Sequence, residues 1–152
     1  MKVVMVGSGN AAVVLGKLIH KSGHQIVQVV SRHIENAHAL AIQYNADSIL
    51  LTKPQFATAD IYIVALHDAA LEHVEKIKGL KNKWVVHTAG SVSIDILKNI
   101  SSTYGVLYPL QSLSRAADHI PEIPFLVDGN TKEIAHKIIQ FARSLSDNVI
   151  AA

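Results

Sequence analysis

Two glycines separated by a single residue stand between an apolar run and a helix-like segment at the start of the chain. Residues 2–6 (KVVMV) have the composition of a buried strand, and Gly7 and Gly9 follow at once. The pattern Gly7-x-Gly9-x-x-Ala12, placed between a strand and a helix, suits the binding of a pyrophosphate. Gly7 permits a sharp turn, Gly9 lets the main chain approach the phosphates, and Ala12 lets the helix pack closely on the sheet. The alternative is a tight turn that holds no ligand.

Strand-like and helix-like segments alternate along the rest of the chain. The predicted strands are residues 2–6, 25–30, 48–51, 61–66, 84–87, 105–108 and 125–127, and the predicted helices are residues 10–21, 34–44, 69–77 and 94–100. A final helix is expected to begin near Asn130 with Glu133 as a capping partner. Its apolar stripe is Ile134, Ile138, Phe141 and Leu145. Strands that are apolar throughout indicate an α/β fold of the Rossmann type, with a doubly wound, mostly parallel sheet and helices on both faces.

Composition narrows the classes of function. The chain of 152 residues has the length of one domain, and it has no cysteine, which excludes a disulfide framework and thiolate catalysis and fits the reducing cytoplasm. The net charge is only +2, and no run of lysine or arginine occurs, so we expect no nucleic-acid or membrane surface. The nine histidines show no metal-binding spacing, and we expect no metal site.

The end of the second predicted strand indicates which dinucleotide would bind. A site for NAD needs a carboxylate about 20 residues after the glycines to bind the ribose 2′-hydroxyl. Here Ser31, Arg32 and His33 follow Val30, and the first carboxylate is Glu35. A guanidinium and a hydroxyl suit a 2′-phosphate, so the sequence predicts NADP(H). The alternatives are a solvated Arg32 and, for His33, a place stacked on the adenine.

Several quoted stretches resemble a known family. "MVGSGNAA" and "VVSR" resemble the NADP-binding half of the pyrroline-5-carboxylate reductase and F420-dependent NADP oxidoreductase superfamily. "VALHDAAL" (64–71), "VVHTAGSVSIDIL" (85–97) and "YGVLYPLQSLS" (104–114), continued by "IPFLVDGN" and "LSDNV", are similar to Rossmann-like proteins with a DUF2520 domain. The resemblance implies an NADP-binding domain over residues 1–148. It implies that residues 149–152 are the truncated start of a helical C-terminal domain, which in this family forms a dimer and walls the substrate cleft. We therefore expect a homo-oligomer.

Ligands in open α/β sheets bind outside the carboxyl ends of the strands, so the residues that follow each predicted strand are the site candidates. The resemblance places the turn after residue 64 over the cofactor's ribose and pyrophosphate. The predicted cofactor-binding residues are Gly7, Ser8, Gly9, Asn10, Ala11, Ala12, Ser31, Arg32, Ala65, Leu66, His67 and Thr88. For the turn at His67 the alternative is that Asp68 caps the next helix and His67 is merely exposed.

The candidates for catalysis lie after the fifth and sixth predicted strands. His87 is a candidate proton donor because a histidine titrates near neutral pH, and Ser91 has a hydroxyl that can bond a substrate oxygen. The resemblance places Tyr108 and Gln111 on the substrate side, where either side chain would orient a carbonyl. The alternatives are a structural His87 at a strand end and a Tyr108 that packs in the core.

These residues predict an NADP(H)-dependent oxidoreductase that reduces a C=O or C=N bond of a small-molecule substrate. A second interpretation is a non-catalytic NADP(H)-binding sensor or partner module. A third is a methyltransferase or a nucleotide-sugar enzyme. The Ser31-Arg32 pair argues against the third, since the ribose of those ligands is bound by a carboxylate.

Overall fold

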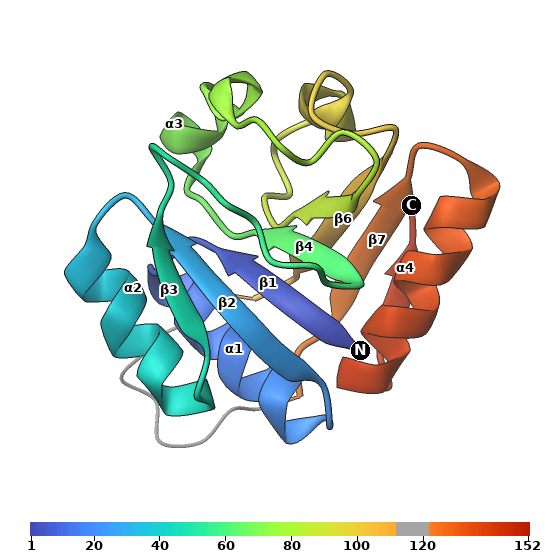
Figure 1. Ribbon diagram of the computed structural model, residues 1–152. Helices are drawn as coiled ribbons and strands as arrows, with labels where there is room; N and C mark the ends of the chain where they lie inside the picture. The colour runs from blue at the N-terminus through green and yellow to red at the C-terminus, as the bar shows by residue number, and fades with distance from the viewer. Residues whose placement is uncertain (112–121) are drawn as a thin grey trace.

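One mixed sheet organises the computed structural model, which describes residues 1–111 and 122–152 (Figure 1). The strands in the described residues are β1 (Lys2–Val6), β2 (Gln25–Ser31), β3 (Asp47–Leu50), β4 (Ile61–Val64), β5 (Trp84–His87), β6 (Thr103–Pro109), β7 (Phe125–Gly129) and β8 (Val149–Ala151). Their order across the sheet is β3-β2-β1-β4-β5-β6-β7-β8. Every neighbouring pair is parallel except β6 and β7. The chain therefore crosses over between β1 and β4, which is the point where a doubly wound sheet binds its ligand.

Helices cover both faces of this sheet. They are α1 (Asn10–Lys21), α2 (Ile34–Ala41), α3 (Asp68–Leu71) and α4 (Lys132–Leu145), with the 3₁₀ helices η1 (Ile42–Tyr44), η2 (Val74–Lys76) and η3 (Ile94–Leu97). The buried side chains of α1, α2 and α4 pack on one face, and those of α3, η2 and the segment around η3 pack on the other. The predicted α/β class with a mostly parallel, doubly wound sheet is confirmed.

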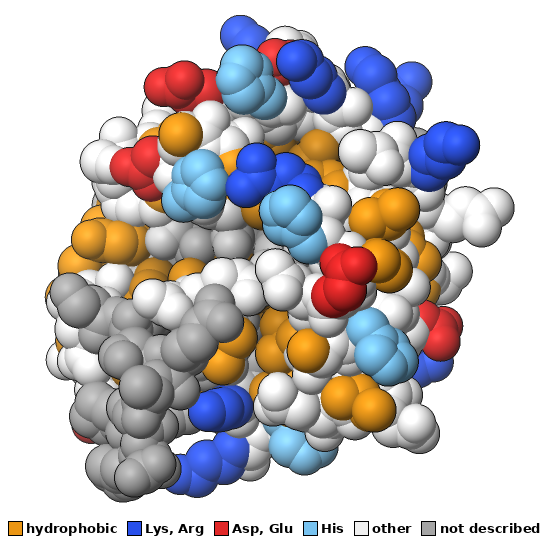
Figure 2. All heavy atoms as spheres, turned by 90° about the vertical axis from the view of Figure 1, so that its left-hand side faces the viewer, with side chains coloured by type: hydrophobic (Ala, Val, Ile, Leu, Met, Phe, Trp, Pro, Cys, Tyr) orange, Lys and Arg blue, Asp and Glu red, His pale blue; other side chains and the backbone are white. Residues whose placement is uncertain are grey.

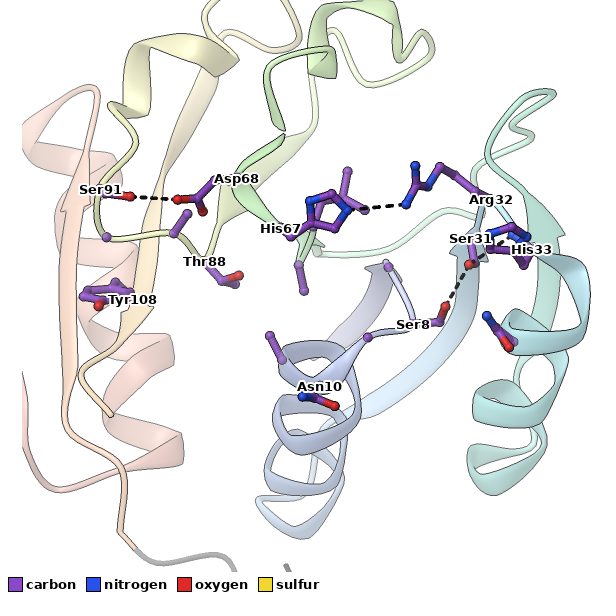
Figure 3. A pocket seen from close by; sticks show the side chains of 18 residues that line it. Ser8, Asn10, Ser31, Arg32, His33, His67, Asp68, Thr88, Ser91 and Tyr108 are labelled. Atoms are coloured by element: carbon purple, nitrogen blue, oxygen red, sulfur yellow. Dashed lines mark hydrogen bonds between the residues drawn. The ribbon is translucent and has the colours of Figure 1, made fainter. Parts of the chain in front are cut away.

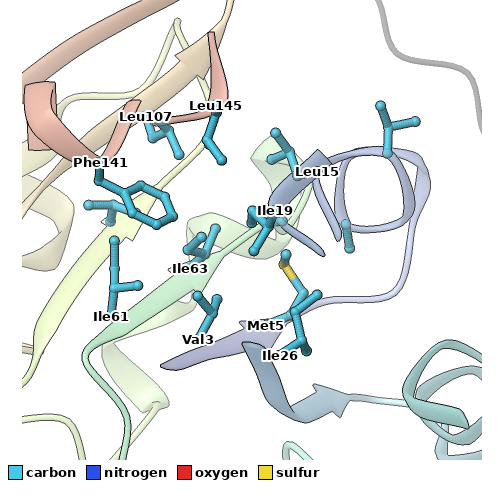
Figure 4. Close-up of a cluster of buried hydrophobic side chains, with 14 of the residues drawn as sticks. Val3, Met5, Leu15, Ile19, Ile26, Ile61, Ile63, Leu107, Phe141 and Leu145 are labelled. Atoms are coloured by element: carbon cyan, nitrogen blue, oxygen red, sulfur yellow. The ribbon is translucent and has the colours of Figure 1, made fainter. Parts of the chain in front are cut away.

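Successive residues of β1 explain why its sequence is apolar throughout. Val3 and Met5 belong to the cluster under α1 and α4, whereas Val4 and Val6 belong to the cluster on the opposite face. Figure 4 shows the first cluster, in which Phe141 of α4 lies near Ile61 and Leu107 from the sheet. A strand buried on both faces has no polar side to alternate with. The predicted apolar stripe of α4 is confirmed, since all four of its members are buried.

Two segments predicted as α-helices are largely 3₁₀ instead. The segment 69–77 begins as the single α-turn of α3 and continues as η2, and the segment 94–100 begins as η3. In the first, Leu71, Val74 and Ile77 are buried, and in the second Leu97 and Ile100 are buried. A spacing of three matches the 3.0 residues per turn of a 3₁₀ helix better than the 3.6 of an α-helix. The burial pattern thus accounts for the tighter winding.

The cap of α4 also differs from the prediction. The helix begins at Lys132, and the Thr131 hydroxyl accepts the bond from the Ile134 amide at 3.1 Å. The side chain of Asn130 instead joins the start of α4 to β6. Its Oδ1 accepts from the Tyr104 amide at 3.1 Å, and its Nδ2 donates to the Ser102 carbonyl at 3.0 Å. A threonine at this position satisfies an amide that the first helical turn leaves without a partner.

The prediction that residues 149–152 begin a helical domain is wrong for these residues. Val149–Ala151 form β8, which pairs in parallel with β7, and the Ala152 amide donates to the Val127 carbonyl at 2.8 Å. The segment therefore belongs to the sheet. Residues 112–121, which include the last residues of the quoted stretch 104–114, lie outside the described residues. Among the described helices, none has the length and hydrophobicity that crossing a bilayer requires.

Candidate functional site

A cleft of about 670 Å³ opens at the carboxyl ends of β1, β2, β4 and β5 (Figure 3). This volume lies within the usual range for small-molecule sites. The described residues that line it are Gly7, Ser8, Gly9, Asn10, Ala11, Ser31, Arg32, His33, Asn36, Ala65, Leu66, His67, Asp68, Thr88, Ala89, Gly90, Ser91 and Tyr108. Most of the predicted cofactor-binding residues therefore meet in one cleft, at the crossover point of the sheet.

The two glycines of the first turn have different physical roles. Gly7 has φ of +123°, and a β-carbon on it would overlap the main-chain carbonyl of Ala65 on the neighbouring β4 turn. Gly9 has φ of −82°, and a β-carbon there would meet nothing within 4 Å. Gly7 is thus required by the fold, whereas Gly9 keeps the main chain open toward the cleft. Ala12 lines no part of the cleft; it is fully buried under the helix, which matches its predicted packing role.

Hydrogen bonds join the glycine turn to the end of β2. The hydroxyls of Ser8 and Ser31 lie 2.8 Å apart, and the Gly7 amide donates to the Val30 carbonyl at 2.7 Å. Ser31 is buried and also accepts from the amide of His33 at 3.3 Å. Arg32 next to it is exposed at the cleft. The turn that would hold phosphates and the pair that would hold the ribose are therefore one hydrogen-bonded unit.

The turn after β4 does not match the alternative in which Asp68 caps α3. His67 is the capping residue, and its Nδ1 accepts from the Ala70 amide at 3.3 Å. Its Nε2 lies 3.4 Å from Nη2 of Arg32. The Asp68 carboxylate, freed from capping, accepts from the Ser91 hydroxyl at 2.9 Å. This bond crosses from the end of β4 to the turn after β5.

The two ends of the cleft differ in charge. Arg32, His33 and His67 lie at the β2 end, and Asp68 is the only carboxylate among the described lining residues. Beside Asp68 and Ser91, the ring of Tyr108 lies so close to Gly90 that a β-carbon on this glycine would overlap it. The cleft thus has a cationic end that suits phosphate and an end of hydroxyl groups that suits a neutral ring and a polar substrate.

Figure 2 shows the edge of the molecule that carries β3 and α2. Lysine, arginine and histidine side chains gather toward the top of this face, on the side of α3, and carboxylates lie among them. In the described part of the chain no three histidine, aspartate or glutamate side chains converge in a way that would hold a metal ion.

The structure places His87 away from the cleft. The side chain is fully buried, its Nδ1 accepts from the Ala89 amide at 3.1 Å, and its Nε2 donates to the Ser93 carbonyl at 3.2 Å. Burial lowers the pKa of His87, although the Ser93 carbonyl, Asp68 and the Val92 carbonyl oppose the shift. A histidine whose two nitrogens bind its own turn serves to shape that turn. The candidate role of proton donor does not fit this placement.

Gln111 is exposed just beyond β6 and does not line the cleft, whereas Ser91, Thr88 and Tyr108 do. Sequence reasoning missed Asn36, which lines the cleft from the first turn of α2. Helical spacing gave a signal for it, because residues three apart share a side of a helix and His33 immediately precedes this helix.

Residues 2–92 match the sequence profile of the family described as "NADP oxidoreductase coenzyme F420-dependent". The chain belongs to this family. Membership implies a nicotinamide cofactor. Comparison with curated proteins found no match.

Solved structures agree with the fold. A candidate NADP oxidoreductase from Bacteroides fragilis superposes with a TM-score of 0.89 at 34% identity, over 99% of this chain and 60% of that protein. A protein from Thermotoga maritima gives 0.78 at 19% identity, over 99% and 57%. The 1-pyrroline-5-carboxylate reductase of Streptococcus pyogenes gives 0.75 at 15% identity, also over 99% and 57%. This chain therefore spans somewhat less than two thirds of each of these proteins.

Proposed function

We propose that this chain is the NADP(H)-binding domain of an oxidoreductase that reduces a C=O or C=N bond of a small metabolite. The observation that carries the proposal is the Ser31-Arg32 pair at the end of β2, hydrogen-bonded through Ser31 to the glycine turn. An NAD site has a carboxylate at this place. Here the side chains supply a hydroxyl and a guanidinium, the groups that bind a phosphate monoester.

The described residues fit the dinucleotide. The open approach at Gly9 and the first amides of α1 suit the pyrophosphate, because the start of a helix offers donors and a partial positive charge. Arg32 and Leu66 also line a second cavity of about 470 Å³. Its other apolar members are Leu51, Pro54, Ala70, Val74 and Ile77. Thr52, His73, Lys76 and Lys78 complete its lining. The apolar members beside a planar guanidinium suit the adenine ring.

When bound, the nicotinamide would supply the hydride chemistry, and the chain would orient the reactants. Thr88, Ala89 and Gly90 offer a small-residue surface at the hydroxyl end of the cleft. Ser91 stays our candidate for hydrogen bonding to the substrate's oxygen; its hydroxyl, which donates to Asp68 at 2.9 Å, would turn its hydrogen from Asp68 to the substrate. Both side chains are exposed, so a substrate reaches them without displacing the core.

Removing the guanidinium tests the choice of cofactor. We expect Arg32→Ala to weaken NADPH binding about tenfold, because a charge-assisted hydrogen bond contributes roughly 1.5–3 kcal/mol. NADH has no 2′-phosphate and should lose less, about two- to fivefold, which is the contribution of the guanidinium beside the adenine ring. Fluorescence titration of both coenzymes measures this. Arg143→Ala, which removes the same charge from the exposed side of α4, is the matched control. Equal affinity of the unaltered protein for NADPH and NADH would refute the preference.

A non-catalytic NADP(H)-binding module is the second candidate function. The observation that favours it is the burial of His87, which removes the expected proton donor from the cleft. The discriminating measurement is NADPH oxidation with a panel of aldehydes, ketones and imines, set beside NADPH binding. Binding with no turnover on any of them supports the sensor or partner module, and turnover on one supports the enzyme.

We extend the proposal to the subfamily and the assembly. The stretches "HTAGS" and "YPLQS" support membership of the DUF2520 subgroup. The absence of cysteine supports a location in the reducing cytoplasm. Exposed apolar side chains at Leu110 and Ile150, near the β6 and β8 side of the sheet, support a homo-oligomer. Light scattering after size-exclusion chromatography tests the last point; a monomer at every concentration would count against it.

A further inference from the structure

The imidazole of His67 faces two hydrogen-bond donors. The Ala70 amide lies 3.3 Å from Nδ1, and Nη2 of Arg32 lies 3.4 Å from Nε2 (Figure 3). A neutral imidazole has one accepting nitrogen, and a protonated imidazole has none. One of the two contacts therefore joins two donors, whichever way the ring is protonated.

The geometry at the start of α3 shows which of the two contacts joins two donors. The Ala70 amide belongs to the first turn of α3 and is shared between the His67 carbonyl, at 3.0 Å, and Nδ1. A hydrogen on Nδ1 would collide with the amide hydrogen, so Nδ1 accepts and Nε2 carries the proton. The Nε2–H of His67 and the guanidinium of Arg32 are then two hydrogen-bond donors directed into the same region of the cleft. Among the described residues, neither group is paired with a carboxylate.

Two donors that converge with no acceptor between them form a site for an anion. The strands explain the convergence, since β2, which ends beside Arg32, and β4, which ends beside His67, are the two neighbours of β1. The two side chains thus reach toward each other at the carboxyl edge, on either side of the turn after β1, as Figure 3 shows. Both are exposed and both line the cleft.

We propose that His67 is the second half of the 2′-phosphate site and that it acts through its Nε2–H together with Arg32. The inference rests on the proposed function. A phosphate monoester fits better than the pyrophosphate, because the pyrophosphate is expected at the start of α1. Arg32 also borders the apolar cavity assigned to adenine. A phosphate on the adjoining ribose lies between that cavity and the glycine turn, where the two donors meet.

The test uses 2′,5′-ADP and 5′-AMP as probes, because they differ only in the 2′-phosphate. We expect His67→Ala to lower the ratio of the two affinities about fivefold, with 5′-AMP changed less than about twofold. His67→Gln, whose amide still offers a donor, should keep most of the preference. His38→Ala, on the exposed side of α2 and outside both cavities, is the control for loss of a histidine. Isothermal titration calorimetry on the unaltered protein, these three variants and Arg32→Ala gives the constants.

The outcomes separate the two proposals. An unaltered protein that binds 5′-AMP and 2′,5′-ADP equally refutes NADP(H) preference, and with it this site. A clear preference that His67→Ala retains in full refutes the role of His67 alone. A preference that falls in both His67→Ala and Arg32→Ala, with 5′-AMP affinity lowered far less than 2′,5′-ADP affinity, supports the two-donor site. Retained binding of 5′-AMP also shows that each variant is folded.

Discussion

Replacing Gly7 by alanine is expected to lower the free energy of unfolding by about 3 kcal/mol or more. Two costs add together. Alanine is strained at a φ of +123°. Its β-carbon would also overlap the Ala65 carbonyl, and a main-chain group cannot avoid the overlap by changing rotamer. The shift would separate β1 from β4, since the Ala65 amide donates to the Val6 carbonyl at 2.8 Å one residue before the turn. Urea unfolding followed by circular dichroism measures the loss.

Gly9→Ala is the matched partner, and the opposite result is expected. Its backbone conformation is open to any residue and the β-carbon meets nothing within 4 Å, so the stability should change by less than about 1 kcal/mol. NADPH binding should weaken at least about tenfold, because the methyl group would occupy the space through which phosphates approach the main chain. A Gly9→Ala protein that binds NADPH normally would show that this turn is only a tight turn. A Gly7→Ala protein of normal stability would contradict the assignment of strain.

The first part of the fold follows from the sequence because its signals are local. The bounds of β1, α1 and β5 agree with the prediction, and each is set by an apolar run or by glycines beside it. The strand β8 gave no such signal. Three residues, Val149–Ala151, become a strand only because β7 offers them an edge. A local sequence pattern cannot predict a strand that forms only by pairing with a segment distant in the sequence.

The site shows the same division. The glycine turn and the Ser31-Arg32 pair are predictable because each residue type has a distinct job at a fixed place after a strand. The Asp68–Ser91 bond is not predictable, because it joins turns 23 residues apart, and the local pattern offers Asp68 only the alternative of capping the next helix. The error over His87 has the same origin. Its place after a strand indicated the cleft, but the tight turn through Ser93 folds over the ring and takes both nitrogens.

This buried histidine gives the second large effect, a loss of stability in mild acid. Burial is the main cause of the lowered pKa of His87, so near pH 6.5 and below the unfolded chain binds a proton that the folded chain resists. Stability is therefore fully present above that pH and is lost as the pH falls. A single titrating group sets an upper limit on this slope of about 1.4 kcal/mol per pH unit. Protonation would also place a hydrogen on Nδ1 against the Ala89 amide.

Urea unfolding of the unaltered protein and of His87→Asn between about pH 5 and pH 7.5 tests this. The asparagine Oδ1 can still accept from the Ala89 amide but does not titrate, so the slope should fall even if the variant is less stable throughout. His24 is the matched comparison, because its pKa is also lowered, by partial burial and then by the N-terminal amine. It precedes β2, at the opposite end of the sheet from His87. The two effects should therefore add, and a variant with asparagine at both His87 and His24 should show the flattest profile. A His87→Asn protein that keeps the full slope would place the proton-sensitive group elsewhere.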